Sequence, residues 1–248
     1  MVTHEDPKPR HDAPQLLLIP GNMCTDLLWR PVEERLIAAG YAVRQAPPLD
    51  ASSVALMAQA VLNTLDTPTI VVGFSMGAIV AAELSRQAPH LVQGLGLIAF
   101  NAYADLPDRA AVRPRQQAAV REGRLRDIVA DELKPNYLAG ANRRDAGLLE
   151  TVMKMALSLG AETFVTQSEA LRLRPDLRPA LASLTMPVLL VCGAEDRLCP
   201  PEWHCGWARS VGDNATFVEI SGAGHLLPLE SPLALADVLL NWLAEKFQ

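Results

Sequence analysis

The amino-acid sequence predicts an α/β protein with a mostly parallel sheet that is covered by helices on both faces. Short β-branched apolar runs alternate with amphipathic helical patterns over most of the 248 residues, which is typical of parallel strands joined by helical crossovers. The alternation is interrupted between residues 101 and 184, where only helical patterns occur. Half of the residues are hydrophobic and a fifth are charged, so the chain can bury a core of ordinary size.

The part of the chain before residue 101 contains four expected strands and three expected helices. Residues 1–14 are polar and rich in proline, so we expect a disordered leader there. Thr25 or Asp26 can cap the first helix, because a side-chain oxygen accepts a hydrogen bond from a free backbone N–H. The strands are expected at residues 15–19, 41–46, 69–74 and 91–100, and the helices at 26–39, 54–65 and 76–87.

The rest of the chain divides into an insertion and the end of the sheet. We expect helices near residues 109–121, 125–138, 145–158 and 161–172, then strands at 187–192 and 216–220, and helices from 201 and from 232 to 247. Residues 101–184 are interpreted as a helical insertion into a core made of residues 15–100 and 185–248. The insertion holds 13 basic and 11 acidic residues. We interpret these charges as solvated helix faces, with attraction of an anionic substrate as the alternative.

The most informative segment is Thr69–Gly77, where an apolar strand leads directly into Gly73-x-Ser75-x-Gly77 and then into a helix. This context is typical of a nucleophile elbow, in which a strained turn lifts a serine hydroxyl clear of the sheet. Gly73 and Gly77 suit such a turn because a side chain would collide with the crowded backbone. Ser75 also stands at a helix N-terminus, where free N–H groups favour negative charge. We therefore predict that Ser75 is a nucleophile.

A serine hydroxyl needs an adjacent base, and that base needs a third group to orient it. Asp196 and His225 each directly follow an expected strand. The carboxyl ends of parallel strands meet at one edge of a sheet, so both side chains are expected beside Ser75. Asp196 is preferred as the orienting acid, with Glu195 as the alternative. The other histidines are interpreted as surface residues, namely His4, His11, His90 and His204.

Acyl transfer also needs N–H groups that bind the oxyanion of the transition state, each worth about 3–4 kcal/mol. The backbone N–H of Met76, directly after Ser75, is one candidate. The loop after the first strand, Pro20-Gly21-Asn22, offers the backbone N–H of Asn22 as the second. A tight turn at Pro20-Gly21 without this role is the alternative.

These motifs and their order resemble the α/β-hydrolase superfamily. The resemblance rests on Gly73-Phe-Ser-Met-Gly77, Gly193-Ala-Glu-Asp196 and Gly224-His-Leu-Leu-Pro-Leu-Glu230, and it covers residues 15–100 and 185–247. It is nearest to small carboxylesterases, enol-lactonases and carbon–carbon bond hydrolases that carry a helical cap, which implies that residues 101–184 cover Ser75. Pro20-Gly21 departs from the common His-Gly and affects how the oxyanion loop is held. The polar leader is too short for the usual initial hairpin, so we expect about six strands.

Substrate contacts are expected in the cap and beside it. Candidates for an apolar pocket are Trp29, Phe100, Met153, Met155 and Phe164, with plain core packing as the alternative for each. Candidates for contacts with a substrate carboxylate are Gln167, Arg172 and Arg174.

Composition argues against several classes of partner. The net charge of −6 does not suit a nucleic-acid surface, and no apolar run approaches the ~20 residues of a membrane span. The four cysteines do not form a disulfide framework, and no secretory segment begins the chain, so we expect a cytoplasmic protein. The cluster from Cys199 to Cys205 matches no zinc spacing. We therefore expect no metal and no organic cofactor.

Together these residues predict a serine hydrolase that cleaves a carboxylic ester or a lactone of a small acyl substrate through an acyl-enzyme on Ser75. Cleavage of a carbon–carbon bond or a thioester by the same residues is one alternative. A small-molecule-binding protein on the same fold, without turnover, is another. The sequence does not predict the oligomeric state.

Overall fold

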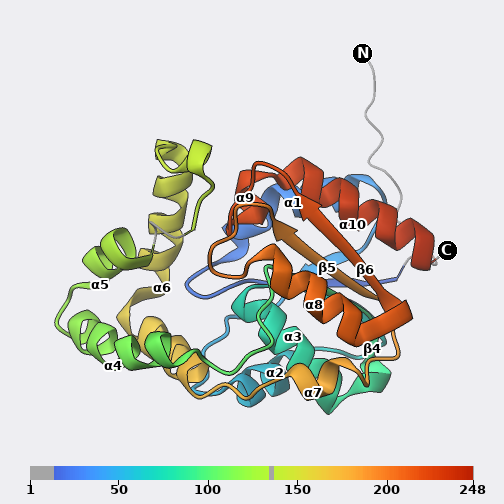
Figure 1. Ribbon diagram of the computed structural model, residues 1–248, viewed down its shortest axis with the longest axis horizontal. Coiled ribbons are helices and arrows are strands. Elements are labelled where there is room, and N and C mark those ends of the chain that lie inside the picture. The colour runs from blue at the N-terminus through green and yellow to red at the C-terminus, as the bar shows by residue number, and fades with distance from the viewer. Residues whose placement is uncertain (1–13, 134–136, 248) are drawn as a thin grey trace.

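The computed structural model describes residues 14–133 and 137–247, which form a six-stranded sheet with helices on both sides (Figure 1). The strands are β1 (Leu16–Ile19), β2 (Val43–Gln45), β3 (Thr69–Phe74), β4 (Val92–Ile98), β5 (Val188–Gly193) and β6 (Ala215–Ile220). Their order across the sheet is β2-β1-β3-β4-β5-β6, and every neighbouring pair is parallel. The predicted α/β class with about six strands is confirmed.

The register of the sheet brings the carboxyl ends of the central strands to one edge. Phe74 at the end of β3 lies beside Ile98 at the end of β4. Gly193 and Ile220, the last residues of β5 and β6, also lie beside each other. The loops that follow these strands therefore leave the sheet together, and side chains from distant parts of the chain can meet there.

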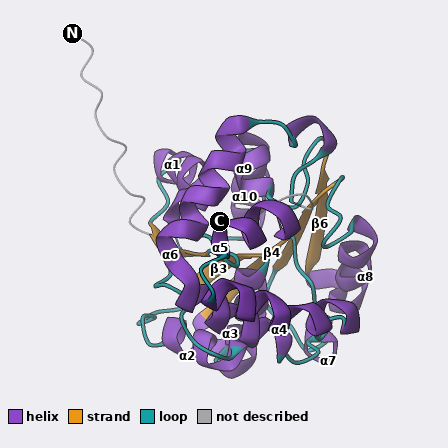
Figure 2. Ribbon diagram, turned by 90° about the vertical axis from the view of Figure 1, so that its left-hand side faces the viewer, coloured by secondary structure: helices purple, strands orange, loops and turns teal. Residues whose placement is uncertain are grey.

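Helices cover both faces of the sheet (Figures 1 and 2). One face carries α1 (Arg30–Ala38) and α10 (Pro232–Lys246), and the other carries α2 (Val54–Leu62), α3 (Met76–Gln87) and α8 (Pro201–Val211). Successive strand residues point to opposite faces, so Leu16 packs on the α1 side and Leu17 on the α3 side. Both are buried, and each such side chain stabilises the fold by about 1.5–3 kcal/mol.

The segment between β4 and β5 is helical, and we call residues 101–184 the insertion. It contains α4 (Pro107–Arg121), α5 (Leu125–Asp127), a π-helical turn (Ile128–Leu133), α6 (Ala146–Arg172) and α7 (Arg178–Leu181). In Figure 1, α4, α5 and α6 stand at the left, beside the sheet and its covering helices. Apolar side chains of these helices and of the π-helical turn form a small cluster that includes Ile128 and Phe164, and Met23 from the loop after β1 also packs in it. The insertion therefore contacts the loop after the first strand.

The observed helices of the insertion differ in detail from the predicted ones. The helices predicted at 145–158 and 161–172 are two parts of α6, which bends at Gly160, where φ is 82°. The helix predicted at 125–138 is observed as α5 and the π-helical turn, with residues 134–136 outside the described part. The bend arises because glycine readily adopts a positive φ, which interrupts the helix without a long loop.

The predicted disordered leader, residues 1–14, lies outside the described residues except for Pro14. The first strand begins at Leu16, one residue later than predicted. Among the described residues, no helix combines the length and the apolar character that a membrane span requires.

One interpretation from the sequence is wrong, because His204 is fully buried in α8. Its Nε2 accepts a hydrogen bond from the backbone N–H of Phe100 at 2.8 Å, and its Nδ1 lies 3.3 Å from the carbonyl oxygen of Pro200. His204 and Trp207 are three residues apart and share the helix face that packs on the sheet. Burial lowers the pKa of His204 to about 4, so the imidazole is a neutral part of the core.

We expect His204 to lower the free energy of unfolding as the pH falls from about 6.5 to about 4. The imidazole of the unfolded chain binds a proton near pH 6.5, whereas burial delays protonation in the folded protein to about pH 4. The unfolded state binds more protons in this window, so stability is lost as the pH falls through it, by about 3 kcal/mol in total. Urea unfolding at several pH values measures how steeply the free energy of unfolding changes with pH. A His204→Gln variant with an unchanged slope would contradict this assignment.

Candidate active site

Ser75 stands in a sharp turn between β3 and α3. Its backbone has a φ of 51° and a ψ of −112°, which a residue with a side chain rarely adopts. A Cβ on Gly73 would lie 2.2 Å from the carbonyl oxygen of Gly77, and a Cβ on Gly77 would lie 2.4 Å from that of Ile19. Close backbone packing therefore requires both glycines. The turn places Ser75 at the first turn of α3, where its side chain lines a cavity.

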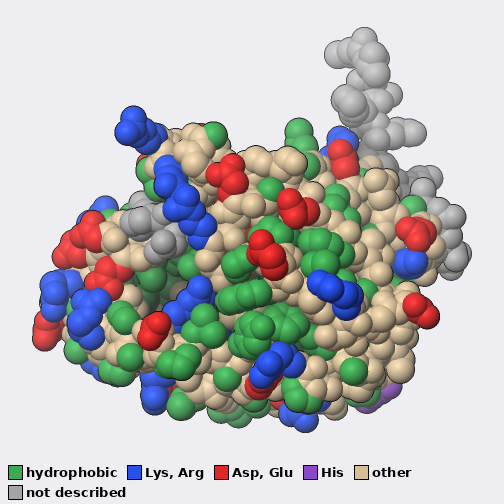
Figure 3. Space-filling view, in the orientation of Figure 1, with side chains coloured by type: hydrophobic (Ala, Val, Ile, Leu, Met, Phe, Trp, Pro, Cys, Tyr) green, Lys and Arg blue, Asp and Glu red, His purple; other side chains and the backbone are tan. Residues whose placement is uncertain are grey.

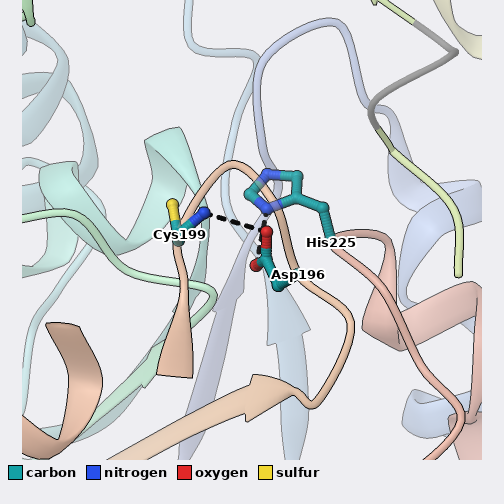
Figure 4. Close-up of side chains that lie close together, drawn as sticks. All are labelled: Asp196, Cys199 and His225. Carbon is teal, nitrogen blue, oxygen red and sulfur yellow. Dashed lines mark hydrogen bonds and ion pairs between the residues drawn. The ribbon is translucent and has the colours of Figure 1, made fainter. Parts of the chain in front are cut away.

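Ser75, His225 and Asp196 form a continuous hydrogen-bonded chain. His225 Nε2 lies 3.0 Å from Ser75 Oγ, and His225 Nδ1 lies 2.8 Å from Asp196 Oδ2. Figure 4 shows the imidazole and the carboxylate facing each other. An ionised carboxylate only accepts hydrogen bonds, so Nδ1 carries the proton and Nε2 accepts from the Ser75 hydroxyl. The imidazole is thus oriented to remove the hydroxyl proton.

Asp196 is a buried carboxylate whose charge is compensated on both oxygens. Its Oδ1 accepts a hydrogen bond from the backbone N–H of Leu198 at 2.8 Å. It also accepts one from the backbone N–H of Cys199 at 2.9 Å, which Figure 4 shows. Burial alone would raise the pKa of this carboxyl group, but His225 and the two N–H groups hold it below its ordinary value. The carboxylate therefore stays charged at neutral pH and can stabilise a protonated His225.

The loops that carry Asp196 and His225 pack directly on each other. A Cβ on Gly193 would lie 2.3 Å from the carbonyl oxygen of Gly224, so the end of β5 needs a glycine. This contact fixes the acid loop against the histidine loop, which keeps the distance between the two side chains short.

Two glutamates tie these loops to the insertion. Glu195, the alternative acid, accepts a hydrogen bond through Oε2 from the backbone N–H of Gly140 at 2.8 Å. Glu230 accepts from the N–H of Gly224 at 3.0 Å through Oε1 and from the N–H of Ala139 at 2.7 Å through Oε2. Glu195 therefore braces the acid loop, whereas Asp196 contacts the histidine.

A cavity of about 430 Å³ lies between the core and the insertion, and Ser75 and His225 line it. In the space-filling view, hydrophobic side chains and a basic side chain surround a hollow on this part of the surface (Figure 3). The apolar walls include Ile79 of α3, Val112 of α4 and Val152 of α6. A cavity of this size and lining suits a small organic substrate.

Of the eight candidate substrate contacts, one is among the residues that line the cavity. Arg174 lines the cavity. Trp29 is fully buried in the core, edge-on against Phe74 with ring centroids 6.5 Å apart, and Phe100 is fully buried on the α3 side. Gln167 is 2% exposed and contacts the loop after β1. The two aromatic side chains pack in the core because a large apolar residue beside a strand serves packing as readily as pocket lining.

Three arginines of the insertion line the cavity, namely Arg109, Arg113 and Arg174. Arg113 and Arg174 both pair with the carboxylate of Asp105, at 2.6 and 2.7 Å. Arg109 donates to a backbone carbonyl oxygen, and within the described residues it pairs with no carboxylate. The acids of the lining are Asp108, which is exposed, and Glu132, which pairs with Arg115. The three arginines are therefore matched in number by Asp105, Asp108 and Glu132, but Arg109 itself is paired with none of these acids among the described residues.

Sequence reasoning missed Tyr137, Arg109 and Arg113. The N–H of His225 donates to the carbonyl oxygen of Tyr137 at 2.8 Å, and the two rings lie 6.1 Å apart. The sequence around Tyr137 does not indicate a role at the site, because its contact with His225 joins segments far apart in the chain. Arg109 and Arg113 did carry a signal, since residues four apart share one face of a helix.

The loop after β1 lies against the start of α3 and beside Ser75. A Cβ on Gly21 would lie 2.7 Å from the ring of Phe74, so this loop passes directly over the end of β3. Asn22 and Met76 both line the cavity. Within the described residues, their backbone N–H groups donate to no protein acceptor. Two such donors beside a nucleophile can bind an oxyanion.

Asp196, Cys199 and His225 are the one group in the described part of the chain with ligand atoms close enough to hold a metal ion, within 4.8 Å of one another (Figure 4). The carboxylate and the imidazole already bind each other. Burial raises the pKa of the Cys199 thiol well above its ordinary value, which keeps the thiol protonated and a poor ligand. The hydrogen-bonded chain to Ser75 accounts for this proximity better than a metal site does.

Comparison with known proteins shows the family to which the chain belongs. The sequence profile of the alpha/beta hydrolase family matches residues 16–238, from the first strand into the last helix. The chain belongs to this family. A protein of Mycobacterium tuberculosis named as a non-heme bromoperoxidase, BpoC, is 29% identical over 92% of this chain and 93% of its own length.

Two further known proteins are similar over most of the chain. The pimeloyl-acyl-carrier-protein methyl ester esterase of Yersinia pseudotuberculosis is 27% identical over 79% of this chain and 77% of its own length. The structure of a thermophilic esterase from Thermogutta terrifontis with malate bound is similar with a TM-score of 0.86 and 26% identity, over 98% of this chain and 93% of that one. The predicted α/β-hydrolase fold is confirmed, and the chain is a member of a family of hydrolases.

We expect Gly73→Ala to destabilise this alpha/beta hydrolase by several kcal/mol, at the upper end of single-residue effects. The new Cβ would lie 2.2 Å from the Gly77 carbonyl oxygen, so the elbow backbone must move. Gly206→Ala is the matched control, because a Cβ at this position of α8 meets nothing within 4 Å, and alanine should stabilise the helix by up to about 1 kcal/mol. Thermal and urea unfolding measure both. Equal stability of the two variants would contradict the packing argument.

Proposed function

We propose that this alpha/beta hydrolase cleaves a carboxylic ester or a lactone through an acyl-enzyme on Ser75. The observation that carries the proposal is the hydrogen-bonded chain from Ser75 through His225 to Asp196, which opens into the cavity. A serine hydroxyl becomes nucleophilic when a neutral imidazole removes its proton and a carboxylate stabilises the resulting imidazolium. The names of two similar proteins, both esterases, support the reaction class.

In the first half-reaction, His225 Nε2 takes the hydroxyl proton while Ser75 Oγ bonds to the substrate carbonyl carbon. The carbonyl oxygen becomes an oxyanion, to which the backbone N–H groups of Asn22 and Met76 donate. The imidazolium then gives its proton to the leaving alkoxide oxygen as the carbon–oxygen bond breaks. Throughout these steps Asp196 accepts a hydrogen bond from the Nδ1–H of His225 and stabilises the positive charge of the imidazolium.

In the second half-reaction, water takes the place of the alcohol. His225 removes a proton from that water as its oxygen attacks the acyl carbon, and the same two N–H groups bind the second oxyanion. The proton returns from His225 to Ser75 Oγ as the acyl bond breaks, which releases the acid. A lactone follows the same steps, with the alcohol still joined to the acyl chain.

Ser75→Ala should lower kcat/KM for p-nitrophenyl butyrate by on the order of 10⁴-fold or more, because the nucleophile is lost. Asp196→Asn should lower kcat by on the order of 10⁴-fold, because an amide no longer selects the correct imidazole tautomer. Ser210→Ala is the control, since this serine of α8 donates only to a helix carbonyl oxygen and should leave turnover within about twofold.

A fluorophosphonate probe separates an enzyme from a binding protein on the same fold. Rapid labelling that Ser75→Ala abolishes is the expected result, because the probe bonds covalently to an activated serine. A folded protein that the probe does not label, and that turns over no ester, lactone or thioester, would favour a small-molecule-binding protein. Turnover that persists in Ser75→Ala would refute the proposed mechanism.

The arginines of the cavity favour a second candidate function, the hydrolysis of a carbon–carbon bond or a thioester in a substrate that carries a carboxylate. Arg109 and Arg113 line the same cavity as Ser75, and Arg109 pairs with no carboxylate in the described part of the chain. A guanidinium group binds a carboxylate in a bidentate geometry. The malate in the structure of the Thermogutta esterase supports a preference for small anionic compounds.

Arg109→Gln should raise KM for p-nitrophenyl hemiglutarate about tenfold while leaving KM for p-nitrophenyl butyrate within about twofold, because one charge-assisted contact is worth about 1.5–3 kcal/mol. Arg124→Gln is the matched control, an exposed arginine of the same insertion that pairs with Glu122. Equal effects on the charged and the neutral ester would argue against a carboxylate contact at Arg109. A β-diketone acid and a thioester tested beside the esters identify the bond that is cleaved.

A further inference from the structure

A side chain of the insertion holds the loop that carries the proposed oxyanion donor. Gln167 of α6 accepts two hydrogen bonds through Oε1, from the backbone N–H of Met23 at 2.8 Å and from Asn22 Nδ2 at 3.0 Å. Its Nε2 donates to the carbonyl oxygen of Leu49 at 3.0 Å. Gln167 is 2% exposed and its side-chain amide is hydrogen-bonded through both the oxygen and the nitrogen, so its position is determined by the fold.

The contact falls on a strained part of the backbone. Met23 has a φ of 53°, in the left-handed region that residues with a side chain rarely adopt, and it is buried. Such a conformation persists only where the surroundings hold it. Without Gln167 the buried N–H of Met23 would lose its acceptor, and the peptide between Asn22 and Met23 could relax.

The loop offers little to brace itself. Pro20 has neither a backbone N–H nor a polar side chain, and Gly21 has no side chain. The one backbone hydrogen bond within the turn runs from the N–H of Cys24 to the carbonyl oxygen of Gly21 at 3.2 Å, among the described residues. Asn22 is the first residue of the loop with a side chain that can hold it, and that side chain bonds to Gln167.

We propose that Gln167 positions the backbone N–H of Asn22 toward the oxyanion, so that the insertion contributes to the chemical step as well as to substrate binding. This inference rests on the proposed function, in which Asn22 donates to the oxyanion. Gln167 fixes Asn22 through its side chain and the following peptide through the N–H of Met23. It is a positioning residue, because it acts on the transition state through this loop. A small rotation of the donor weakens an oxyanion contact that forms only in the transition state.

The test is Gln167→Met, which keeps the length and bulk of the side chain and removes both hydrogen-bonding ends. We expect kcat for p-nitrophenyl butyrate to fall 10- to 100-fold, with KM changed less than about threefold, because ground-state binding does not use the oxyanion donors. The inhibition constant of an alkyl trifluoromethyl ketone should rise by a similar factor. Ser75 Oγ adds to that ketone, its proton passes to His225, and the product is a hemiketal oxyanion that needs the same N–H groups.

Gln117→Met is the matched control. Gln117 is a buried glutamine of α4 that donates to Ser168 Oγ and Glu169 Oε2, both on α6, and has no contact with the loop after β1 among the described residues. It should leave kcat and the inhibition constant within about twofold. Circular dichroism at the assay temperature verifies that both variants are folded.

Unchanged kcat and inhibition constant in folded Gln167→Met would overturn the inference, and so would a loss that appears in KM alone. If Gln167→Met does not fold, Asn22→Ala tests the inference instead, because it removes only the hydrogen bond from Asn22 Nδ2 to Gln167. Its kcat and inhibition constant should then both worsen two- to fivefold, and an effect on KM alone would again overturn the inference. Ser75→Ala tests the proposed function separately. An ester hydrolase that depends on Ser75 but is indifferent to Gln167 refutes this inference alone.

Discussion

Direct packing of backbone on backbone at the carboxyl edge of the sheet is the constraint on which the site depends. Gly73 lies against Gly77, Gly77 lies against the carbonyl oxygen of Ile19, and Gly193 lies against Gly224. Each approach is too close for a Cβ atom. These contacts fix the loop after β1 against the Ser75 turn, and the Asp196 loop against the His225 loop. The parallel sheet places both pairs at one edge, where Ser75, Asp196 and His225 meet within hydrogen-bond distance. Protein interiors transmit such constraints because they are closely packed.

The insertion is joined to the same machinery through side chains. Gln167 holds the loop after β1, Glu195 and Glu230 tie the acid and histidine loops to residues 139–140, and the carbonyl oxygen of Tyr137 accepts from the His225 N–H. The helices over the cavity and the reacting groups beneath it are thus one hydrogen-bonded unit. A change in the insertion can therefore reach the geometry at Ser75 without touching a substrate.

The arginines of the insertion lie in two kinds of environment, the solvated surface and the lining of the cavity. Arg124 pairs with Glu122 at the surface, as expected for solvated helix faces. Arg109, Arg113 and Arg174 instead face the cavity. The sequence could not separate the two groups, since an arginine that lines a cavity and one that faces water have the same local pattern. Only the packing of α4 against α6 decides which face of the helix is enclosed.

The sequence by itself determined the parallel α/β fold, the strained turn at Ser75 and the order of Ser75, Asp196 and His225 at the ends of strands. These features follow from local rules, namely hydrophobic periodicity and the small size of glycine. The tertiary structure decided that Trp29 and Phe100 pack in the core, that His204 is buried and that Gln167 reaches a loop 144 residues earlier in the chain. Such contacts are absent from any local window, because they depend on how whole elements pack against one another.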